Sequence, residues 1–409
     1  MALLARPCTQ AASILTMLQG HVHPDFAEVA STFATILRSR PGGGAASVYH
    51  RGVKVVDLWG GTKDSEGHPW LEDTTSPSFS TTKGVVSTLL HVLADQGRVH
   101  YDDPVYRHWP EFAAAGKDGI TVRHLMTHEA GLYRLNEMVS HPQQMLDWDF
   151  MVQTLSAAKP VHSPGEQHGY HAITYGWLVG GLIEKIMGER LAVILKRELA
   201  DPLGLDGLYV GLPEEALARR AHLLNGVLRR PTVKDGWQSD LADAVRRGLL
   251  FVGVDLTEFR AALFPFYTPF DFNSEEVVRA CIPAANGQFT ARSLARMYAM
   301  IAEGGSIDGV QLLSSARVQT MGEIRNRTRD NVLFIPMRWR LGYHRVFALG
   351  AKAPSGFGHY GYGGSGAFCD PSRRLSVALT VNGGSGTPTG DARMPRLAGA
   401  AIRCVDRLG

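Results

Sequence analysis

The sequence is poor in cysteine and in long apolar runs, and each shortage excludes a class of protein. Its four cysteines form no Cys-x-x-Cys pair, which argues against a zinc ribbon or disulfide scaffold and favours a reducing compartment. They are Cys8, Cys281, Cys369 and Cys404. No run reaches the roughly eighteen apolar residues of a membrane-spanning helix. Residues 1–19 are mildly apolar but interrupted by Arg6, Pro7 and Gln10, so we identify no signal peptide.

The chain also lacks a strong charge bias. Its formal net charge is +3 over 409 residues, and no long basic run occurs, so the sequence gives no case for nucleic acid or an anionic membrane surface. A hydrophobic content of 44% and a charged content of 20% are ordinary for a globular protein. We therefore expect a cytoplasmic protein whose partner is a small molecule.

Lysine is scarce as well, with only nine in the chain. One of them closes the stretch Ser80-Thr81-Thr82-Lys83, which precedes a mainly apolar run from Val85 to Ala94. A helix beginning at Ser80 would place Ser80 and Lys83 on one face, at the positive end of the helix dipole. A neighbouring lysine can take or relay the serine's proton, so the pattern indicates an activated nucleophile. The alternative is an N-cap serine beside a solvent-facing lysine.

A second Ser-x-x-Lys occurs at Ser156-Ala157-Ala158-Lys159. Pro160 follows it directly and disfavours helical backbone at Lys159. This copy therefore sits at the end of a segment, and we do not expect Ser156 to be a nucleophile.

Strand patterns lie at both ends of the chain and helical patterns between them. The predicted strands are 45–49, 53–59, 366–370 and 375–381, with hairpin turns at 50–52 and 371–374. The predicted helices include 25–38, 173–187, 290–303 and 394–408, with Gly188 closing the second and Thr290 capping the third. This order is not an alternating βαβ pattern. It predicts an α+β fold, an α/β sandwich whose antiparallel sheet is built from both termini and flanked by helices, with a mainly helical middle region.

The same pattern sets the expected domain boundaries. Residues 1–22 form an N-terminal extension, residues 23–112 and 306–409 form the α/β domain, and residues 113–305 form the helical domain. Within the helical domain, residues 213–283 form an irregular insertion. Its aromatic tract at 264–267 is expected to line a substrate pocket.

A serine nucleophile needs a proton acceptor and an oxyanion hole, and two later stretches can supply them. Tyr170 lies on a loop just before the 173–187 helix, where its phenol can point into a cleft or simply pack at the helix entry. His359-Tyr360-Gly361 lies in a glycine-dense stretch whose backbone N–H groups can approach a ligand closely. Taken alone, that stretch is a flexible loop, and His359 is a packed or surface imidazole.

With these three stretches the chain resembles the serine β-lactamase and penicillin-binding-protein superfamily, on its class C side, and the related family VIII carboxylesterases. Those proteins carry Ser-x-x-Lys, then Tyr-x-Asn or a variant, then Lys-Thr-Gly or a variant such as His-x-Gly. Here the motifs are Ser80-Thr81-Thr82-Lys83, Tyr170-His171-Ala172 and His359-Tyr360-Gly361. Flanking stretches at 55–61, 125–132, 201–205 and 287–305 are also similar, and the resemblance spans roughly 25–408. It implies the β-lactamase/transpeptidase-like fold.

The resemblance also implies roles. Ser80 attacks the acyl carbonyl, and Lys83 and Tyr170 share the base role, with the proton holder left open. The backbone N–H groups of Ser80 and Tyr362 form the oxyanion hole. Substrate contacts fall to the residues of the later motifs, namely Ala172, His359, Tyr360 and Gly361. No metal or other cofactor is implied.

Departures from the family pattern point to the substrate class. Ala172 replaces the asparagine that binds a lactam side-chain amide, and His359 replaces a charged lysine that helps hold a lactam carboxylate. No Ser-Asp-Asn occurs. Two Lys-x-Gly copies, beginning at Lys117 and Lys234, look like solvated turns. The site therefore favours neutral esters over anionic lactams.

Other interpretations fit less well. Gly-x-Gly-x-x-Gly at 356–361 matches a dinucleotide fingerprint, but no strand feeds it and no helix follows. The Gly-x-Ser-x-Gly elbow is missing, and His128-Glu129 lacks the second histidine of a zinc helix. We expect a serine carboxylesterase for short-chain or small hydrophobic acyl esters. The alternatives are a β-lactamase or D-amino-acid peptidase, an acyltransferase of the same fold, and a non-catalytic scaffold relative.

Overall fold

The computed structural model describes residues 18–224, 227–228, 256–263, 270–383 and 391–409. Its centre is a seven-stranded antiparallel sheet in the order β1-β3-β2-β14-β13-β12-β11. The strands are β1 Leu18–Val22, β2 Gly43–His50, β3 Val53–Gly61, β11 His344–Arg345, β12 Phe357–Tyr360, β13 Gly366–Asp370 and β14 Leu375–Val381. N-terminal β2 pairs with C-terminal β14, which confirms a sheet built from both termini and the predicted α+β fold class.

Local sequence sets the two hairpins of this sheet. β2 and β3 are joined by Arg51 and Gly52, both at positive φ (52° and 77°), as the tightest two-residue hairpin loops require. The loop between β13 and β14 is the 3-10 turn Pro371–Arg373, followed by Arg374 at φ 49°. Both hairpins lie where the sequence predicted strands around a turn.

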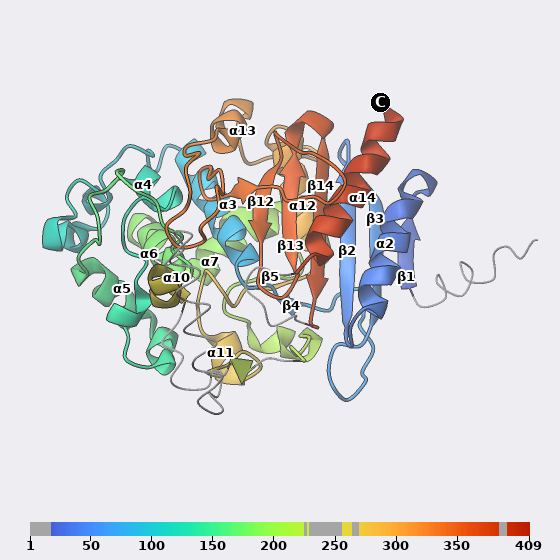
Figure 1. The fold of residues 1–409 in the computed structure, drawn as a ribbon, viewed down its shortest axis with the longest axis horizontal. Coiled ribbons are helices and arrows are strands. Elements are labelled where there is room, and N and C mark those ends of the chain that lie inside the picture. The colour runs from blue at the N-terminus through green and yellow to red at the C-terminus, as the bar shows by residue number, and fades with distance from the viewer. Residues whose placement is uncertain (1–17, 225–226, 229–255, 264–269, 384–390) are drawn as a thin grey trace, which may run out of the picture.

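Helices cover both faces of the sheet (Figure 1). One face packs on α2 (Ala27–Arg38) and α14 (Arg393–Leu408), and its buried side chains include Val48, Val377 and Leu379. The other face packs on α3 (Thr81–Asp95) and α12 (Ala291–Ala302). Successive residues of a strand point to opposite faces, so alternating apolar residues feed two separate cores.

Two elements extend this domain beyond the predicted boundaries. Leu18–Val22 forms β1 and pairs with β3 at the sheet edge, although the sequence predicts these residues as part of the N-terminal extension. Helix α12, which we had assigned to the middle region, packs against β2, β13 and β14. In both cases pairing or packing with distant segments decides membership.

The middle of the chain is mainly helical, as predicted. Its helices are α4 Val122–Met126, α5 Trp148–Ala157, α6 Thr174–Met187, α7 Leu191–Leu195, the π-helical turn Lys196–Ala200, α8 Asp201–Leu203, α10 Leu256–Leu263 and α11 Glu275–Arg279, with α13 Ser315–Gly322 after them. Gly188 ends α6 in the left-handed conformation, as its position predicted. Part of the expected insertion, including its aromatic tract 264–267, lies outside the described residues.

Short elements complete the fold. The 3-10 helices are Pro24–Phe26, Val105–Arg107, Pro110–Gly116, Leu135–Glu137, Pro142–Leu146 and Glu214–Arg219. The short strands are β4 Ser76–Pro77, β5 Leu208–Tyr209, β6 Val227–Leu228, β7 Phe270–Asp271, β8 Gln288–Phe289, β9 Ser306–Ile307 and β10 Val310–Gln311. β4, β8 and β5 form a three-stranded sheet, so β4 is fixed just before α3 begins.

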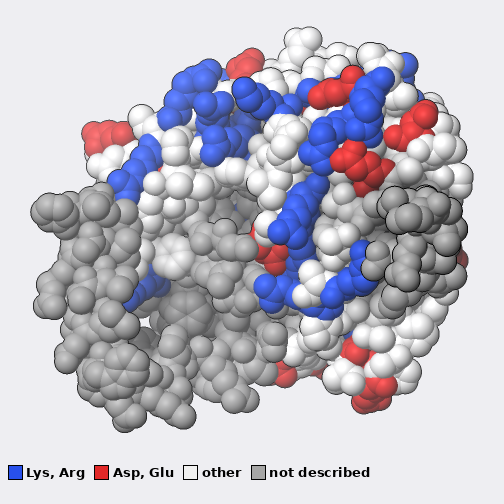
Figure 2. All heavy atoms as spheres, turned by 45° about the vertical axis from the view of Figure 1, so that its right-hand side comes forward, with Lys and Arg blue, Asp and Glu red and all other residues white. Residues whose placement is uncertain are grey.

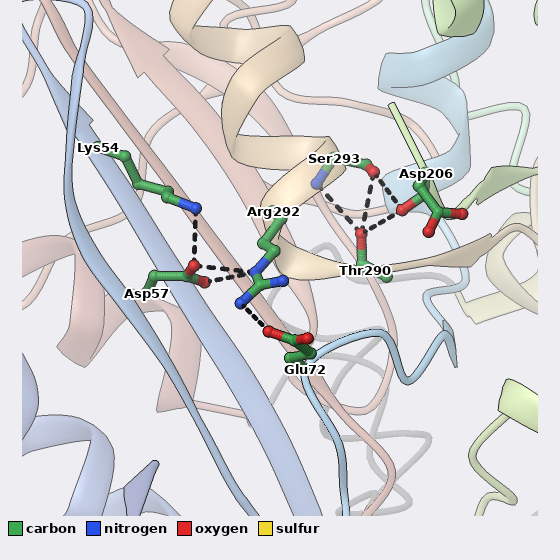
Figure 3. Close-up of polar contacts among 7 residues, drawn as sticks. All are labelled: Lys54, Asp57, Glu72, Asp206, Thr290, Arg292 and Ser293. Atoms are coloured by element: carbon green, nitrogen blue, oxygen red, sulfur yellow. Dashed lines mark hydrogen bonds and ion pairs between the residues drawn. The ribbon is translucent and has the colours of Figure 1, made fainter. Parts of the chain in front are cut away.

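A polar network fixes the start of α12 (Figure 3). Thr290 caps the helix as predicted, with its Oγ1 accepting from the Ser293 N–H at 3.2 Å. Arg292, in the first turn of the helix, donates from Nε to both carboxylate oxygens of Asp57 at 2.9 Å. Its Nη2 donates to Glu72 at 3.0 Å. Because Asp57 lies on β3, these charge-assisted bonds tie α12 to the N-terminal half of the sheet.

The surface over α2 and α14 carries mixed charge. Figure 2 turns this side forward and shows a diagonal band of Lys and Arg with Asp and Glu beside it. On these helices Glu28 pairs with Arg403 at 2.6 Å and Arg407 at 2.8 Å. Among the residues that the structure describes, no helix combines the length and apolar character needed to cross a membrane.

Candidate active site

Ser80 lies at the head of α3, one residue after a strained backbone position. Phe79 has φ 45°, which is rare for an aromatic residue. Its ring packs against the rings of Phe272 and Tyr362, with centroid distances of 5.0 Å and 5.3 Å. The helix that follows is buried from Thr81 to Ala94. Ser80 itself is only partly buried, so its hydroxyl sits at the open end of a fixed, buried helix.

The Lys83 side chain is fully buried, with 0% exposure. Its Nζ lies 3.0 Å from Ser80 Oγ, 2.6 Å from the Ala172 carbonyl and 3.0 Å from the Ala284 carbonyl. Burial lowers the pKa of Lys83 well below its ordinary value, because the ammonium is removed from water and none of these three partners is a carboxylate. The lysine is therefore not the solvent-facing group of the N-cap alternative.

Tyr170 reaches the same hydroxyl as Lys83. Its phenol donates to Ser80 Oγ at 2.8 Å, and its ring stacks on Trp339 at 5.4 Å with an interplanar angle of 10°. Lys83 Nζ lies 4.9 Å from the Tyr170 ring centroid. Burial raises the pKa of Tyr170, so the phenol stays protonated at neutral pH. The structure thus brings Ser80, Lys83 and Tyr170 together.

Two glycines let the third motif approach α3. A Cβ on Gly84 would lie 2.2 Å from the Tyr298 hydroxyl and 3.3 Å from His359 Cβ. A Cβ on Gly361 would lie 2.2 Å from the Ser78 carbonyl oxygen. Since any side chain at either position would clash, both glycines are required for β12 to pass beside the start of α3.

The predicted oxyanion donors have free N–H groups. In the described part of the chain, neither the Ser80 nor the Tyr362 backbone N–H donates a hydrogen bond. The preceding N–H, that of Gly361, bonds to the Ser365 carbonyl at 2.8 Å and closes the turn that holds Tyr362. The two donors are therefore available, and the ring contact between Phe79 and Tyr362 keeps their segments together.

His359 and Ala172 are more buried than their predicted contact with substrate suggests, whereas Tyr360 and Gly361 are half-buried. His359 is 2% exposed and packs edge-on to His344 at 4.7 Å, and burial lowers its pKa well below the usual value. The Tyr360 hydroxyl donates to the Phe347 carbonyl at 3.0 Å, away from Ser80. The Ala172 side chain lies in an apolar cluster with Tyr170, while its carbonyl binds Lys83. Their substrate roles stay predictions.

Four contributors to this arrangement were not predicted as site residues. They are Ala284, whose carbonyl binds Lys83, Trp339, which stacks on Tyr170, His128, whose Nδ1 accepts from the His171 N–H at 3.2 Å, and Asp330, which accepts from the Tyr170 N–H at 3.1 Å. Backbone carbonyls carry no sequence signal. The other three lie more than forty residues from their partners or in loops without a pattern.

The predicted solvated turn at Lys117 is wrong. Lys117 is 0% exposed, and its Nζ donates to the carbonyls of Ala114 (2.7 Å), Ser156 (2.9 Å) and Ala158 (2.6 Å). The lysine satisfies the carbonyls at the end of α5, which is why burying it is tolerated. Lys234 lies outside the described residues.

Within the described ranges, no group of three or more His, Cys, Asp or Glu side chains is arranged to hold a metal ion. The polar atoms around Ser80 are instead an amine, a phenol and backbone groups. Such a set suits proton transfer to and from a serine hydroxyl.

Known proteins resemble this chain in sequence and fold. The Beta-lactamase family profile matches residues 29–402. Esterase/beta-lactamase LipL of Mycobacterium tuberculosis is 40% identical over 370 residues, covering 89% of this chain and 82% of LipL. A penicillin-binding protein homologue from Caulobacter crescentus has a TM-score of 0.81 at 34% identity, covering 95% of this chain and 99% of its own.

A family VIII carboxylesterase of known structure has a TM-score of 0.78 at 32% identity, with 95% of this chain and 99% of that chain covered. These matches confirm the resemblance drawn from the three motifs. Because the family profile spans most of the chain, and relatives above 30% identity are matched over nearly their whole length, this chain is a hydrolase of the Beta-lactamase family.

Proposed function

We propose that the protein is a serine carboxylesterase that cleaves short-chain or small hydrophobic acyl esters through an acyl-enzyme on Ser80. The observation that carries the proposal is the convergence of Lys83 Nζ (3.0 Å) and Tyr170 OH (2.8 Å) on Ser80 Oγ. A serine flanked by two proton-transfer groups, beside two free backbone N–H groups, has the parts that acyl transfer needs.

The contacts of Lys83 favour it as the proton acceptor. A neutral amine has two N–H groups and one lone pair, and the carbonyls of Ala172 and Ala284 accept the two N–H groups. The lone pair then faces Ser80 Oγ. Burial lowers the pKa of Lys83 and raises that of Tyr170, which favours a neutral amine beside a neutral phenol.

The reaction follows from these positions. Lys83 takes the Ser80 proton as Oγ attacks the acyl carbon, and the N–H groups of Ser80 and Tyr362 bind the oxyanion that forms. The proton passes to the leaving alcohol, directly or through the Tyr170 phenol, and the acyl-enzyme remains. Water attacks the acyl carbon, gives its proton back along the same path, and releases the acid and free Ser80.

Neutral esters suit this site better than anionic lactams. The third-motif cation is replaced by His359, which is buried and whose lowered pKa keeps it neutral. A neutral imidazole is a weaker partner for a lactam carboxylate than a lysine. The family VIII carboxylesterase among the solved relatives agrees with this choice, while the name of LipL keeps β-lactamase activity as the second candidate, with D-amino-acid peptidase activity beside it.

The test is steady-state kinetics on p-nitrophenyl esters of increasing chain length beside a chromogenic cephalosporin. We expect the highest kcat/KM on a short-chain ester and weak cephalosporin turnover. A cephalosporin hydrolysed as well as the best ester would favour the lactamase instead. A fluorophosphonate should label the parent and leave Ser80→Ala unlabelled, and labelling of that variant would refute the acyl-enzyme on Ser80.

We also propose a cytoplasmic location. The thiols of Cys281, Cys369 and Cys404 are free, which fits a reducing compartment. Fractionation of the cells that make the protein would test this.

A further inference from the structure

Asp330 is a fully buried carboxylate beside the site, and the mechanism above does not use it. It lies between α13 and β11, in the segment from residue 323 to residue 343, and is 0% exposed. No Lys, Arg or His in the described ranges lies within ion-pair distance of it, although the buried His168 interacts with its charge, and burial raises the pKa of Asp330. A buried carboxylate without a cation is costly unless hydrogen bonds satisfy it, so its partners show what it is for.

All of its partners are N–H donors. Oδ1 accepts from the backbone N–H groups of Tyr170 (3.1 Å), Val332 (2.9 Å) and Leu333 (2.9 Å), and Oδ2 accepts from the Trp339 indole Nε1 at 2.8 Å. A protonated carboxyl would need an acceptor for its own O–H, whereas the ionised form only accepts. Four donors around two oxygens therefore match the carboxylate.

Two of these four bonds lead to the residue that contacts Ser80. The Tyr170 N–H bond fixes the main chain of Tyr170. The bond to Trp339 fixes the indole, whose ring stacks on the Tyr170 ring at 5.4 Å and 10°. His128 packs on Tyr170 as well, at 5.1 Å and 66°. The phenol therefore has little freedom to leave Ser80 Oγ while Asp330 holds both its backbone and its stacking partner.

The remaining two bonds join the Asp330 carboxylate to the backbone of its own loop. The N–H groups of Val332 and Leu333 follow Asp330 by two and three residues, so the carboxylate caps its own loop. This loop carries Trp339 toward Tyr170, two segments that are 169 residues apart. One side chain thus joins them.

We propose that Asp330 is a positioning residue for Tyr170, holding its phenol on Ser80 Oγ through the Tyr170 backbone and the Trp339 indole. The proposal rests on the proposed function, since it assigns Tyr170 a part in proton transfer. A misplacement of about 1 Å can cost on the order of 10²-fold in rate when reacting groups must be aligned, so the effect falls on kcat more than on substrate binding.

The test is Asp330→Asn, which keeps the volume but turns an N–H₂ group toward the N–H of Trp339 or of Tyr170. We expect kcat on the best p-nitrophenyl ester to fall at least about tenfold with KM within about twofold, and fluorophosphonate labelling of Ser80 to slow in parallel. The matched control is Asp370→Asn. Asp370 is equally buried and accepts from the Ser372 N–H and from Arg373 at the β13–β14 turn, remote from Ser80.

The indole arm is tested separately. Trp339→Phe keeps an aromatic ring on Tyr170 and removes one donor to Asp330, so it should lower kcat several-fold with KM unchanged. This variant also serves if Asp330→Asn does not fold. The double variant should lose less than the product of the two single losses, because both act on one contact. Multiplicative losses would overturn the coupling between the two residues.

The outcomes separate this proposal from the proposed function. If Asp330→Asn has the kcat and labelling rate of Asp370→Asn, with both variants only less stable, the positioning role is overturned while the esterase stands. The same holds if a folded Trp339→Phe keeps the parent kcat. If Ser80→Ala is as active as the parent, the proposed function falls, whatever Asp330 does.

Discussion

The chain carries Ser-x-x-Lys twice, in opposite surroundings. Ser80 begins a buried helix, and its lysine turns inward to the hydroxyl at 3.0 Å. Ser156 lies near the end of α5, where its hydroxyl donates to the Gln153 carbonyl of its own helix at 2.8 Å. Lys159 follows Ala158, whose ψ of 145° has left the helix, and is exposed. The same four-residue pattern therefore makes a site only where a helix starts.

The lysine that contacts Ser156 is Lys117, which donates to the Ser156 carbonyl. Its set of hydrogen-bond acceptors differs from that of Lys83 in one member. Lys83 binds two carbonyls and a hydroxyl, whereas Lys117 binds three carbonyls. Three carbonyls use all three protons of an ammonium and leave no lone pair for chemistry. Two carbonyls leave one position for the exchange of a proton with serine. The difference between a structural lysine and a proposed base is thus a single partner.

The largest expected effect separates the two serines. Ser80→Ala should lower ester hydrolysis by at least about 10³-fold, because the proposed acyl-enzyme forms on the oxygen that this change removes. Ser156→Ala should retain nearly full activity, since its hydroxyl only bonds to its own helix. Steady-state kinetics on one p-nitrophenyl ester measures both. Equal losses in the two variants would break the comparison.

The next effect concerns the groups around Ser80. Lys83→Ala and Tyr170→Phe should each lower kcat by at least about 10²-fold, which general acid–base help is typically worth. Because both contact the same oxygen, the double variant should lose far less than the product. Lys159→Ala is the matched control and should keep the parent kcat. A double variant with fully multiplicative losses would show that the two groups act separately.

The pH dependence sharpens the contrast further. If neutral Lys83 is the base, kcat/KM should fall about tenfold for each pH unit below its pKa, since protonation removes the lone pair. Burial lowers this pKa, so the acid limb should lie below the range near 10.4 of an ordinary lysine. A pH–rate profile of the parent measures the limb. A flat profile down to the range of carboxylate titration would exclude a lysine base.

The smallest effect on activity is expected at Lys117. Lys117→Met keeps the buried aliphatic volume but leaves three carbonyls without a donor, which should lower the free energy of unfolding by about 1–3 kcal/mol. Burial lowers the pKa of Lys117 to about 8, so the side chain is mostly an ammonium at neutral pH, and the substitution removes all three of its donors. Urea denaturation measures the loss. Reduced kcat in the folded variant would contradict the purely structural role.

Much of the fold was predictable because its signals are local. Alternating apolar residues marked the strands, the Arg51-Gly52 loop marked a hairpin, and Thr290 and Gly188 marked helix ends. The predicted domain boundaries differ from the structure where a distant segment decides. β1 is a strand because it pairs with β3, and α12 is part of the α/β domain because it packs against β14.

The site divides in the same way. The amino-acid sequence by itself determined which residue types meet, because motif order and helix spacing named Ser80, Lys83, Tyr170 and His359. Only the tertiary structure decided their states. It buried Lys83 between two carbonyls and set Asp330 behind Tyr170. Protonation and orientation depend on desolvation and on hydrogen bonds from segments far apart in the chain, and these exist only once the chain has folded.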